Sequence, residues 1–171
     1  MSGRRPDDMT LTSILPTLRD SLPSPFDREV WPARTTPTLD DVVVAGVSLL
    51  RIVDLCATPC VYTGAAVIPM SGGVVSSTDS TTVVVARIAE TDAGSIRLDA
   101  TFRLHAPLWR EARLLGRVSH AYEQPFSVLD ADSGAVSGVV RIPGDPRVGD
   151  LVAVPCPGCF SVGDVRPSRG R

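Results

Sequence analysis

The stretch TTVVVARIAETDAGSIRLDATFRL, residues 81–104, carries the clearest strand pattern in the chain and decides the fold class. Its first part, 81–89, is rich in the β-branched residues Val and Thr, which strands favour. In its second part, 95–104, polar and apolar residues alternate, which would turn one apolar face of a strand inward. The sequence DAG at 92–94 is a turn signal between the two parts. We therefore expect a β-hairpin here.

Outward from this hairpin, short apolar segments recur along the chain between turn residues. The expected strands are 42–45, 61–68, 112–119, 125–129, 136–142, 151–155 and 160–165. A short helix is expected at 48–55 and a polar loop at 70–80. The chain contains 14 Gly and 15 Pro, which marks many turns and argues against a helical bundle. We predict a mainly β fold, a compact antiparallel β-barrel or Greek-key sandwich with one or two short helices.

The chain before the first of these strands has a different character. We expect a disordered leader at 1–9, and an amphipathic helix followed by a proline-rich connector at 10–41. The helix is indicated by apolar residues at helical spacing: Leu11, Ile14, Leu15, Leu18 and Leu22. The β domain would then span 42–166, followed by a disordered tail at 167–171.

The composition excludes several classes of function. The net charge is -2, which gives no electrostatic reason to bind nucleic acid or an acidic membrane surface. We find no signal peptide and no apolar run of about 18 residues, the length of a membrane-spanning helix. We therefore expect a cytoplasmic protein. In that compartment its four cysteines would be free or metal-bound rather than paired in disulfides.

The basic residues carry a chemical restriction. All 17 of them are arginine, so the sequence contains no lysine. Pyridoxal phosphate is held in enzymes as a Schiff base to a lysine amine. We therefore expect this chain to be independent of pyridoxal phosphate.

Two segments nevertheless resemble one family of pyridoxal-phosphate enzymes. Residues 42–62, VVVAGVSLLRIVDLCATPCVY, are similar to the entry segment of the fold-type III decarboxylases, the diaminopimelate and ornithine decarboxylase family. Residues 113–160 are similar to the end of the same enzymes. They contain the sequence RLLGRVSHAYEQPFSVL and, after it, VVRIPGDPRVGDLVAVPCPGCF. The resemblance implies that this chain folds like the small β domain of those enzymes. In them this domain mainly dimerises and closes over the cofactor.

The departures from the family pattern imply that its catalysis is lost. The family's (β/α)8 barrel, which holds the lysine and the phosphate cradle, has no counterpart in this chain. The family's cysteine acid falls at Ser119, its acidic motif residue at Glu123, and its Gly-Ala-Tyr tyrosine at Phe160. The resemblance therefore implies a decarboxylase-like pseudoenzyme whose partner is a second copy, in a homodimer, or a full-length decarboxylase-like chain.

The cysteines form two closely spaced pairs. Cys56 and Cys60 are spaced C-x3-C, and Cys156 and Cys159 are spaced C-x2-C. Two such pairs can supply four thiolates to one zinc ion. Two other interpretations stay open, namely independent buried thiols and a redox pair. Zinc, in the first interpretation, is the one cofactor that this pattern suggests.

His120, Tyr122 and Glu123 are the candidate catalytic residues. They lie in the segment that reaches the active site in the resembled family, and histidine titrates near neutrality, as a general acid or base requires. The alternative for His120 is an exposed histidine in a turn.

A second polar group lies in the hairpin expected at 81–104. Arg97, Asp99 and Arg103 share one face of the expected strand. They would form a polar ligand site if that face lined a barrel lumen, and ordinary surface charges if it faced solvent. His105 is expected to be a loop residue.

Two functions from different classes follow. The first is a non-catalytic domain that dimerises or binds a partner. The alternative is a cofactor-independent enzyme of secondary metabolism, a cyclase or isomerase, that uses a reshaped barrel pocket and a small-molecule substrate. A third hypothesis is a structural module stapled by zinc. An apolar pocket of a few hundred cubic ångströms would favour the enzyme, whereas a filled interior would favour the binding domain.

Overall fold

The computed structural model describes residue 22 and residues 24–168. The leader predicted at 1–9 and most of the helix predicted within 10–41 lie outside these residues. The described elements are β1 (Thr35–Pro37), β2 (Val42–Val44), β3 (Val47–Ser48), α3 (Leu49–Cys56), β4 (Cys60–Val67), β5 (Val75–Asp92), β6 (Ser95–Leu98), the 3-10 helix η1 (Trp109–Glu111), β7 (Arg113–Leu115), β8 (Glu123–Leu129), β9 (Val136–Pro143), β10 (Leu151–Pro157) and α4 (Val162–Val165).

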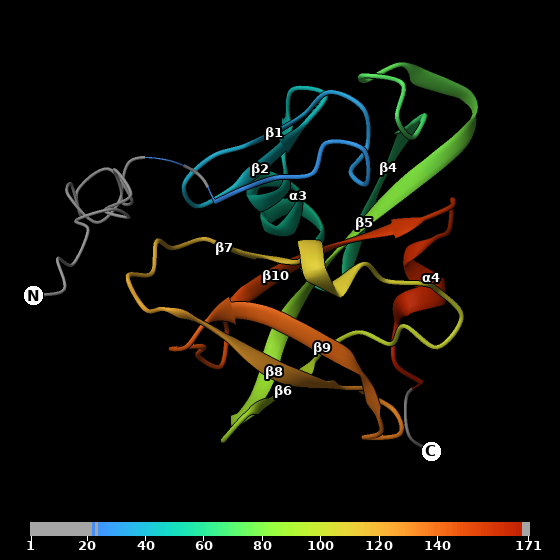
Figure 1. Cartoon of the computed structure of the whole chain (residues 1–171). Coiled ribbons are helices and arrows are strands. Elements are labelled where there is room, and N and C mark those ends of the chain that lie inside the picture. The colour runs from blue at the N-terminus through green and yellow to red at the C-terminus, as the bar shows by residue number, and fades with distance from the viewer. Residues whose placement is uncertain (1–21, 23, 169–171) are drawn as a thin grey trace, which may run out of the picture.

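The main sheet has seven strands, in the order β7-β10-β5-β6-β8-β9, and β4 also pairs with β5. Strand β5 is 18 residues long. Its first part lies between β4 and β10, and its last part pairs with β6. All pairings of this sheet are antiparallel except that of β6 with β8, which is parallel. The sheet curls into a half-barrel whose edge strands, β7 and β9, approach each other across an open seam (Figure 1).

Strand β5 is buried on both faces because each face carries its own apolar core. Neighbouring side chains of a strand point to opposite sides of the sheet. Val84, Ala86 and Ile88 therefore pack inside the curl, whereas Val83 and Val85 pack on the other side. This explains why the sequence is continuously apolar here rather than alternating.

Apolar side chains fill the interior of the half-barrel. They include Ile96, Leu98, Phe102, Trp109, Phe126, Val128, Val140, Ile142, Val152 and Val154. The second core packs α3 and the small sheet β1-β2-β3 against the opposite face of the main sheet (Figure 1). Its fully buried members include Trp31, Val44 and Leu49.

The predicted fold class is confirmed: the described chain is mainly β, with the short helices α3 and α4 and the single turn η1. The predicted helix at 48–55 is also confirmed. It begins where the Ser48 hydroxyl accepts a hydrogen bond from the Arg51 amide at 3.1 Å, as an N-cap does.

Four local predictions were wrong. The loop predicted at 70–80 is already strand from Val75 onward, because β4 pairs with β5 as far as Val75. The strand predicted at 95–104 ends at Leu98. The connector predicted within 10–41 contains strand β1, which pairs with β2. The strand predicted at 160–165 is the helix α4, which Ser161 and Asp164 begin with a reciprocal capping box.

Among the described residues, no helix combines the length and the apolar character needed to cross a bilayer.

Candidate functional site

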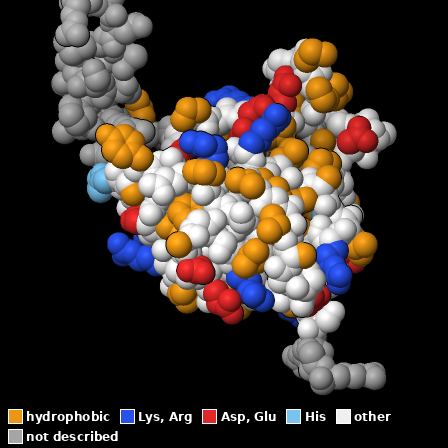
Figure 2. Space-filling view, turned by 60° about the horizontal axis from the view of Figure 1, so that its bottom comes forward, with side chains coloured by type: hydrophobic (Ala, Val, Ile, Leu, Met, Phe, Trp, Pro, Cys, Tyr) orange, Lys and Arg blue, Asp and Glu red, His pale blue; other side chains and the backbone are white. Residues whose placement is uncertain are grey.

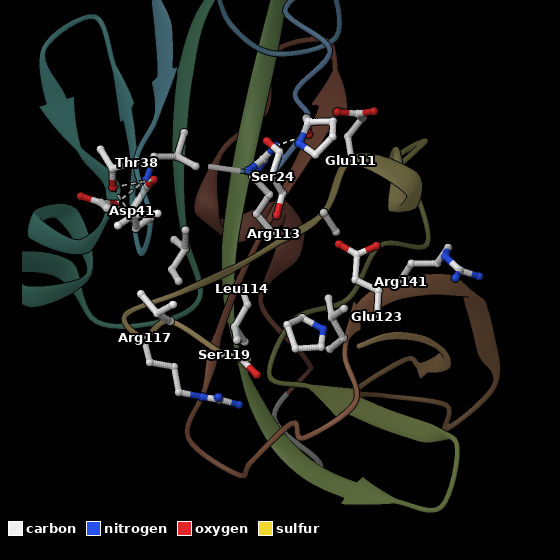
Figure 3. Close-up of a pocket in the computed structure, with 18 of the residues that line it drawn as sticks. Ser24, Thr38, Asp41, Glu111, Arg113, Leu114, Arg117, Ser119, Glu123 and Arg141 are labelled. Carbon is white, nitrogen blue, oxygen red and sulfur yellow. Dashed lines mark hydrogen bonds between the residues drawn. The ribbon is translucent and has the colours of Figure 1, made fainter. Parts of the chain in front are cut away.

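A groove of about 340 Å³ opens at the seam of the half-barrel. One wall is the segment at 110–119, which contains β7, and the opposite wall is formed by the start of β8 and the end of β9. The chain before β1 and the turn between β1 and β2 complete the groove. Figure 3 shows Thr38 and Asp41 on one side of the groove, and Glu123 and Arg141 on the other.

The groove exists because the seam is closed only in part. Trp109 Nε1 donates a hydrogen bond of 3.2 Å to the main-chain oxygen of Ser137 in β9, and this bond fastens η1 across the seam. Further along, β7 leaves the seam at Gly116, whose positive φ of 83° suits glycine. The Gly116 amide donates to the main-chain oxygen of Asp40 at 2.7 Å, which places the β1–β2 turn at the groove.

Arg117 is the most heavily bonded charged side chain in the groove. Its guanidinium donates to both carboxylate oxygens of Asp150 and, through Nη1, to Asp145 Oδ2 at 3.0 Å. Nη2 also donates to the Asp145 main-chain oxygen at 2.7 Å. Hydrogen bonding to Asp150 in the first place, and also to Asp145, raises the pKa of Arg117. Its charge therefore holds the loop at 145–150 in place.

Ser119 belongs to the same network. Its hydroxyl donates to Asp145 Oδ1 at 2.5 Å. This bond, assisted by Arg117, lowers the pKa of Asp145, although partial burial opposes the shift. The lowered pKa and the bonds from Arg117 make Asp145 a weak base toward the Ser119 hydroxyl, so we assign these bonds to holding the loop in place.

Arg113 and Asp41 also serve the fold. Arg113 donates to the main-chain oxygens of Ser24 and Pro25, and its guanidinium lies 5.2 Å from the ring centre of Phe26. Asp41 accepts hydrogen bonds from the Ser48 hydroxyl and from the amides of Val42 and Leu50. Arg113 thus anchors the chain before β1, and Asp41 supports the start of α3.

The structure does not assemble the predicted catalytic group within the groove. Glu123 is exposed and lines the groove. Ser119 is half-buried and also lines the groove. His120 and Tyr122 are exposed and do not line it, and Tyr122 is 75% exposed. Catalysis by these residues remains a prediction.

The structure divides the four cysteines between different environments. Cys60 is buried in the core beside α3, whereas Cys156 is buried inside the half-barrel. Cys56 and Cys159 are exposed. Within the described ranges, no three His, Cys, Asp or Glu side chains are grouped as a metal site. This arrangement favours independent thiols, and zinc binding stays a prediction.

Burial also makes the two inner thiols unreactive. It raises the pKa of Cys156 to about 12. It raises the pKa of Cys60 to about 11, with the nearby Cys56 and Asp99 adding to the effect. Both therefore remain protonated near neutral pH, which disfavours thiolate chemistry.

The polar group predicted in the hairpin is engaged locally. Arg97 pairs with Glu90 at 3.1 Å. Asp99 accepts from the Thr58 hydroxyl at 2.6 Å and from the Arg87 amide at 2.7 Å. Arg103 is exposed. Since apolar side chains fill the half-barrel, these residues do not line a lumen.

His105 lies in a loop, as the sequence predicts, but it is not solitary. Its ring stacks on Phe160 with 3.8 Å between the ring centres. Phe160 occupies the position where the resembled family has tyrosine, and this ring packs against the core rather than lining the groove.

A second surface feature is the tip of the β4–β5 hairpin, which projects from the body (Figure 1). Ile68, Met70, Val74 and Val75 are exposed by 43, 93, 55 and 46%. We call these four residues the hairpin tip. Hydrophobic side chains are visible on the corresponding projection in Figure 2. Large apolar side chains gathered on an exposed projection are typical of an association surface.

The sequence offered little signal for the groove. Asp41 is far in the chain from Arg113 and Arg117, and the hydrogen bond from the Gly116 amide to the main-chain oxygen of Asp40 brings the two segments together. The partial exception is the sequence DPRVGD at 145–150, which contains the turn residues Pro146 and Gly149 and forms the loop that Arg117 binds.

Comparisons with protein-family models, with curated proteins and with solved structures find no match for this chain. The similarity to fold-type III decarboxylases therefore remains a prediction from the quoted segments.

Proposed function

We propose that this chain is a non-catalytic β domain that works by association, first of all with a second copy of itself. The observation that carries the proposal is the filled interior of the half-barrel. Large apolar side chains from β5, β6, β8, β9 and β10 occupy the space that a barrel enzyme would use for its substrate.

The groove supports the same proposal by its chemistry. Enzymes need a nucleophile, acid or base that is free to act on a substrate. Here hydrogen bonds within the fold already engage the charged groups of Arg113, Arg117 and Asp41. The absence of lysine from the sequence excludes the Schiff-base chemistry of the resembled family.

The hairpin tip is the surface through which we propose that two copies meet. When a partner covers an exposed apolar cluster, the free energy of association becomes more favourable by about 25 cal/mol for each Å² of apolar area removed from water. The tip is well placed for this contact because the hairpin carries it away from the body of the domain (Figure 1).

A full-length decarboxylase-like chain is the second partner that we propose, and it rests on the sequence resemblance. The cofactor-independent enzyme stays as the alternative function. The volume of the groove favours it, because about 340 Å³ falls at the lower end of the range for small-molecule sites, roughly 300–1,000 Å³.

The test is the mass of the full chain in solution, measured by sedimentation over a range of concentrations. We expect a dimer of the 18.1 kDa chain that dissociates on dilution. The double variant Met70→Asp/Val74→Asp should be monomeric. Aspartate is tolerated at position 70, where the backbone φ is 57°.

Leu104→Asp is the matched control, because Leu104 is 83% exposed and lies outside the hairpin tip. It should remain dimeric. A wild-type chain that is monomeric at every concentration would contradict self-association. Mixing it with a purified diaminopimelate decarboxylase then tests the second partner, and the absence of a joint species would exclude that partner as well.

A further inference from the structure

The rim of the groove carries apolar side chains that no described segment covers. Leu22, Leu39 and Val118 all line the groove, and they are exposed by 59, 43 and 43%. Single exposed apolar residues are ordinary, but several that surround one hollow indicate a docking surface.

The charged side chains in the groove argue against a charged small ligand as the occupant. Arg117 is held by two carboxylates, and Arg113 by main-chain oxygens. Arg141 and Glu123, which carry opposite charges, stand on the same wall of the groove (Figure 3). Beside these polar groups, the groove leaves the apolar rim of Leu22, Leu39 and Val118 uncovered.

The chain itself enters the groove at this rim. Leu22 lines the groove, and so do Ser24 and Pro25, which Arg113 holds through their main-chain oxygens. The 21 residues that precede Leu22 lie outside the described structure. The segment directly before Leu22 thus starts at the groove and has no linker to cross.

This segment has an apolar pattern that suits the groove. Leu15 and Leu18 precede Leu22 by seven and four positions, so on a helix they share one face with it. Ile14 extends the same face. A helix of residues 13–21, in which Pro16 falls within the first turn, would be about 14 Å long, at 1.5 Å per residue.

We propose that the groove is the docking site for residues 11–21 of the same chain, with Leu15 and Leu18 packed against Leu39 and Val118. The direct connection through Leu22 gives the segment an effective concentration in the millimolar range. Its own segment therefore has the advantage over a separate peptide or a second copy. This docking is independent of self-association, which we assign to the hairpin tip.

The test is amide hydrogen exchange of the full chain, followed at 38–42 and 113–119, which line the groove. Replacing two leucines of the apolar face, in Leu15→Asp/Leu18→Asp, should speed exchange in both regions by on the order of ten-fold. Exchange at 83–86, in the middle of β5, should not change, which shows that the domain stays folded. The Met70→Asp/Val74→Asp variant should exchange in the groove like wild type.

The matched control is Ser13→Asp/Thr17→Asp, which adds the same charge on the opposite face of the helix and should leave the groove protected. Equal exchange in wild type and Leu15→Asp/Leu18→Asp would overturn the proposal. So would protection that appears only at high protein concentration, because it would mean docking between copies.

A second measurement tests whether the groove binds this segment when it is supplied as a separate peptide. A synthetic peptide of residues 10–22, added in excess to Leu15→Asp/Leu18→Asp, should restore the protection of 113–119. A peptide with the same two aspartates should not. If the native peptide failed to restore protection, the groove would not be its binding site.

Discussion

Trp109 and Ser137 are joined across the seam of the half-barrel by a hydrogen bond of 3.2 Å from the indole Nε1 to the main-chain oxygen. The indole also meets the Phe102 ring edge to face, with 4.8 Å between the ring centres. This contact closes one part of the gap between the two edge strands, and the groove occupies the part that remains open. The integrity of the groove thus depends on a few side chains that hold the seam.

Gly138 tests this closure because a side chain there would overlap the Trp109 indole. We expect Gly138→Ala to displace Trp109 and to lower the free energy of unfolding by about 1–3 kcal/mol, as overpacking in a core does. Urea denaturation followed by tryptophan fluorescence measures the change. Gly163→Ala, where the added Cβ would lie 3.4 Å from the nearest atom, is the control and should change stability little. Equal stability of both variants would show that Trp109 does not fill this space.

Arg117 should contribute more to stability than a surface arginine. Arg117→Met removes the bonds to Asp145 and Asp150 and leaves two carboxylates without their cation, so we expect a loss of about 2 kcal/mol. Arg147→Met is the comparison, because Arg147 is 69% exposed and lies 3.9 Å from Asp145. It should have almost no effect. Thermal unfolding of both variants measures this, and an equal loss would refute the assigned role.

Asp130 should make the free energy of unfolding depend on pH in the acid range. Its side chain is buried, and burial alone would raise its pKa. Hydrogen bonds from Thr101, Ser133 and Asp132 outweigh that effect and lower the pKa below the ordinary 3.8. The carboxylate therefore stabilises the folded state above about pH 4, and this contribution is lost as the pH falls through the lowered pKa.

The expected result is a smaller loss of unfolding free energy between pH 6 and pH 3 in Asp130→Asn than in wild type. Urea denaturation at several pH values measures it. Ser133→Ala removes one donor and should give an intermediate dependence. Parallel curves for wild type and Asp130→Asn would contradict the role of Asp130.

The cysteines should fall into two reactivity classes. Cys56 and Cys159 are exposed and should react with a thiol reagent at neutral pH in the folded protein. Cys60 and Cys156, whose pKa values are raised to about 11 and 12, should react only after unfolding. Because unfolded thiols ionise first, folding stability should also fall as the pH rises above about 9. Four rapidly reacting thiols in the native state would contradict this assignment.

The hairpin at 81–104 shows how far the sequence predicts this fold. Its β-branched first part and its DAG turn predict strands β5 and β6 correctly, because local pattern and core agree there. The pattern continues past Leu98, yet the strand does not, because Ala100 and Phe102 are buried by packing rather than by a strand partner. Similarly, Phe160 and Val162 suggested a strand, but the capping box of Ser161 begins a helix.

The candidate site was less predictable for a physical reason. Groove residues such as Asp41, Arg113 and Arg141 come from three separate parts of the chain, and no local spacing relates them. The local spacing of the cysteine pairs left a shared zinc site, independent buried thiols and a redox pair open. The alternation of side chains across the sheet sends Cys60 and Cys156 into different cores, which no local spacing shows.

The mass of the full chain in solution tests the central claim most directly. Sedimentation equilibrium should show a species of twice the 18.1 kDa chain mass that dissociates on dilution and that Met70→Asp/Val74→Asp abolishes. A chain that remains monomeric at the highest concentration, with or without these substitutions, would contradict the proposal that the domain works by self-association.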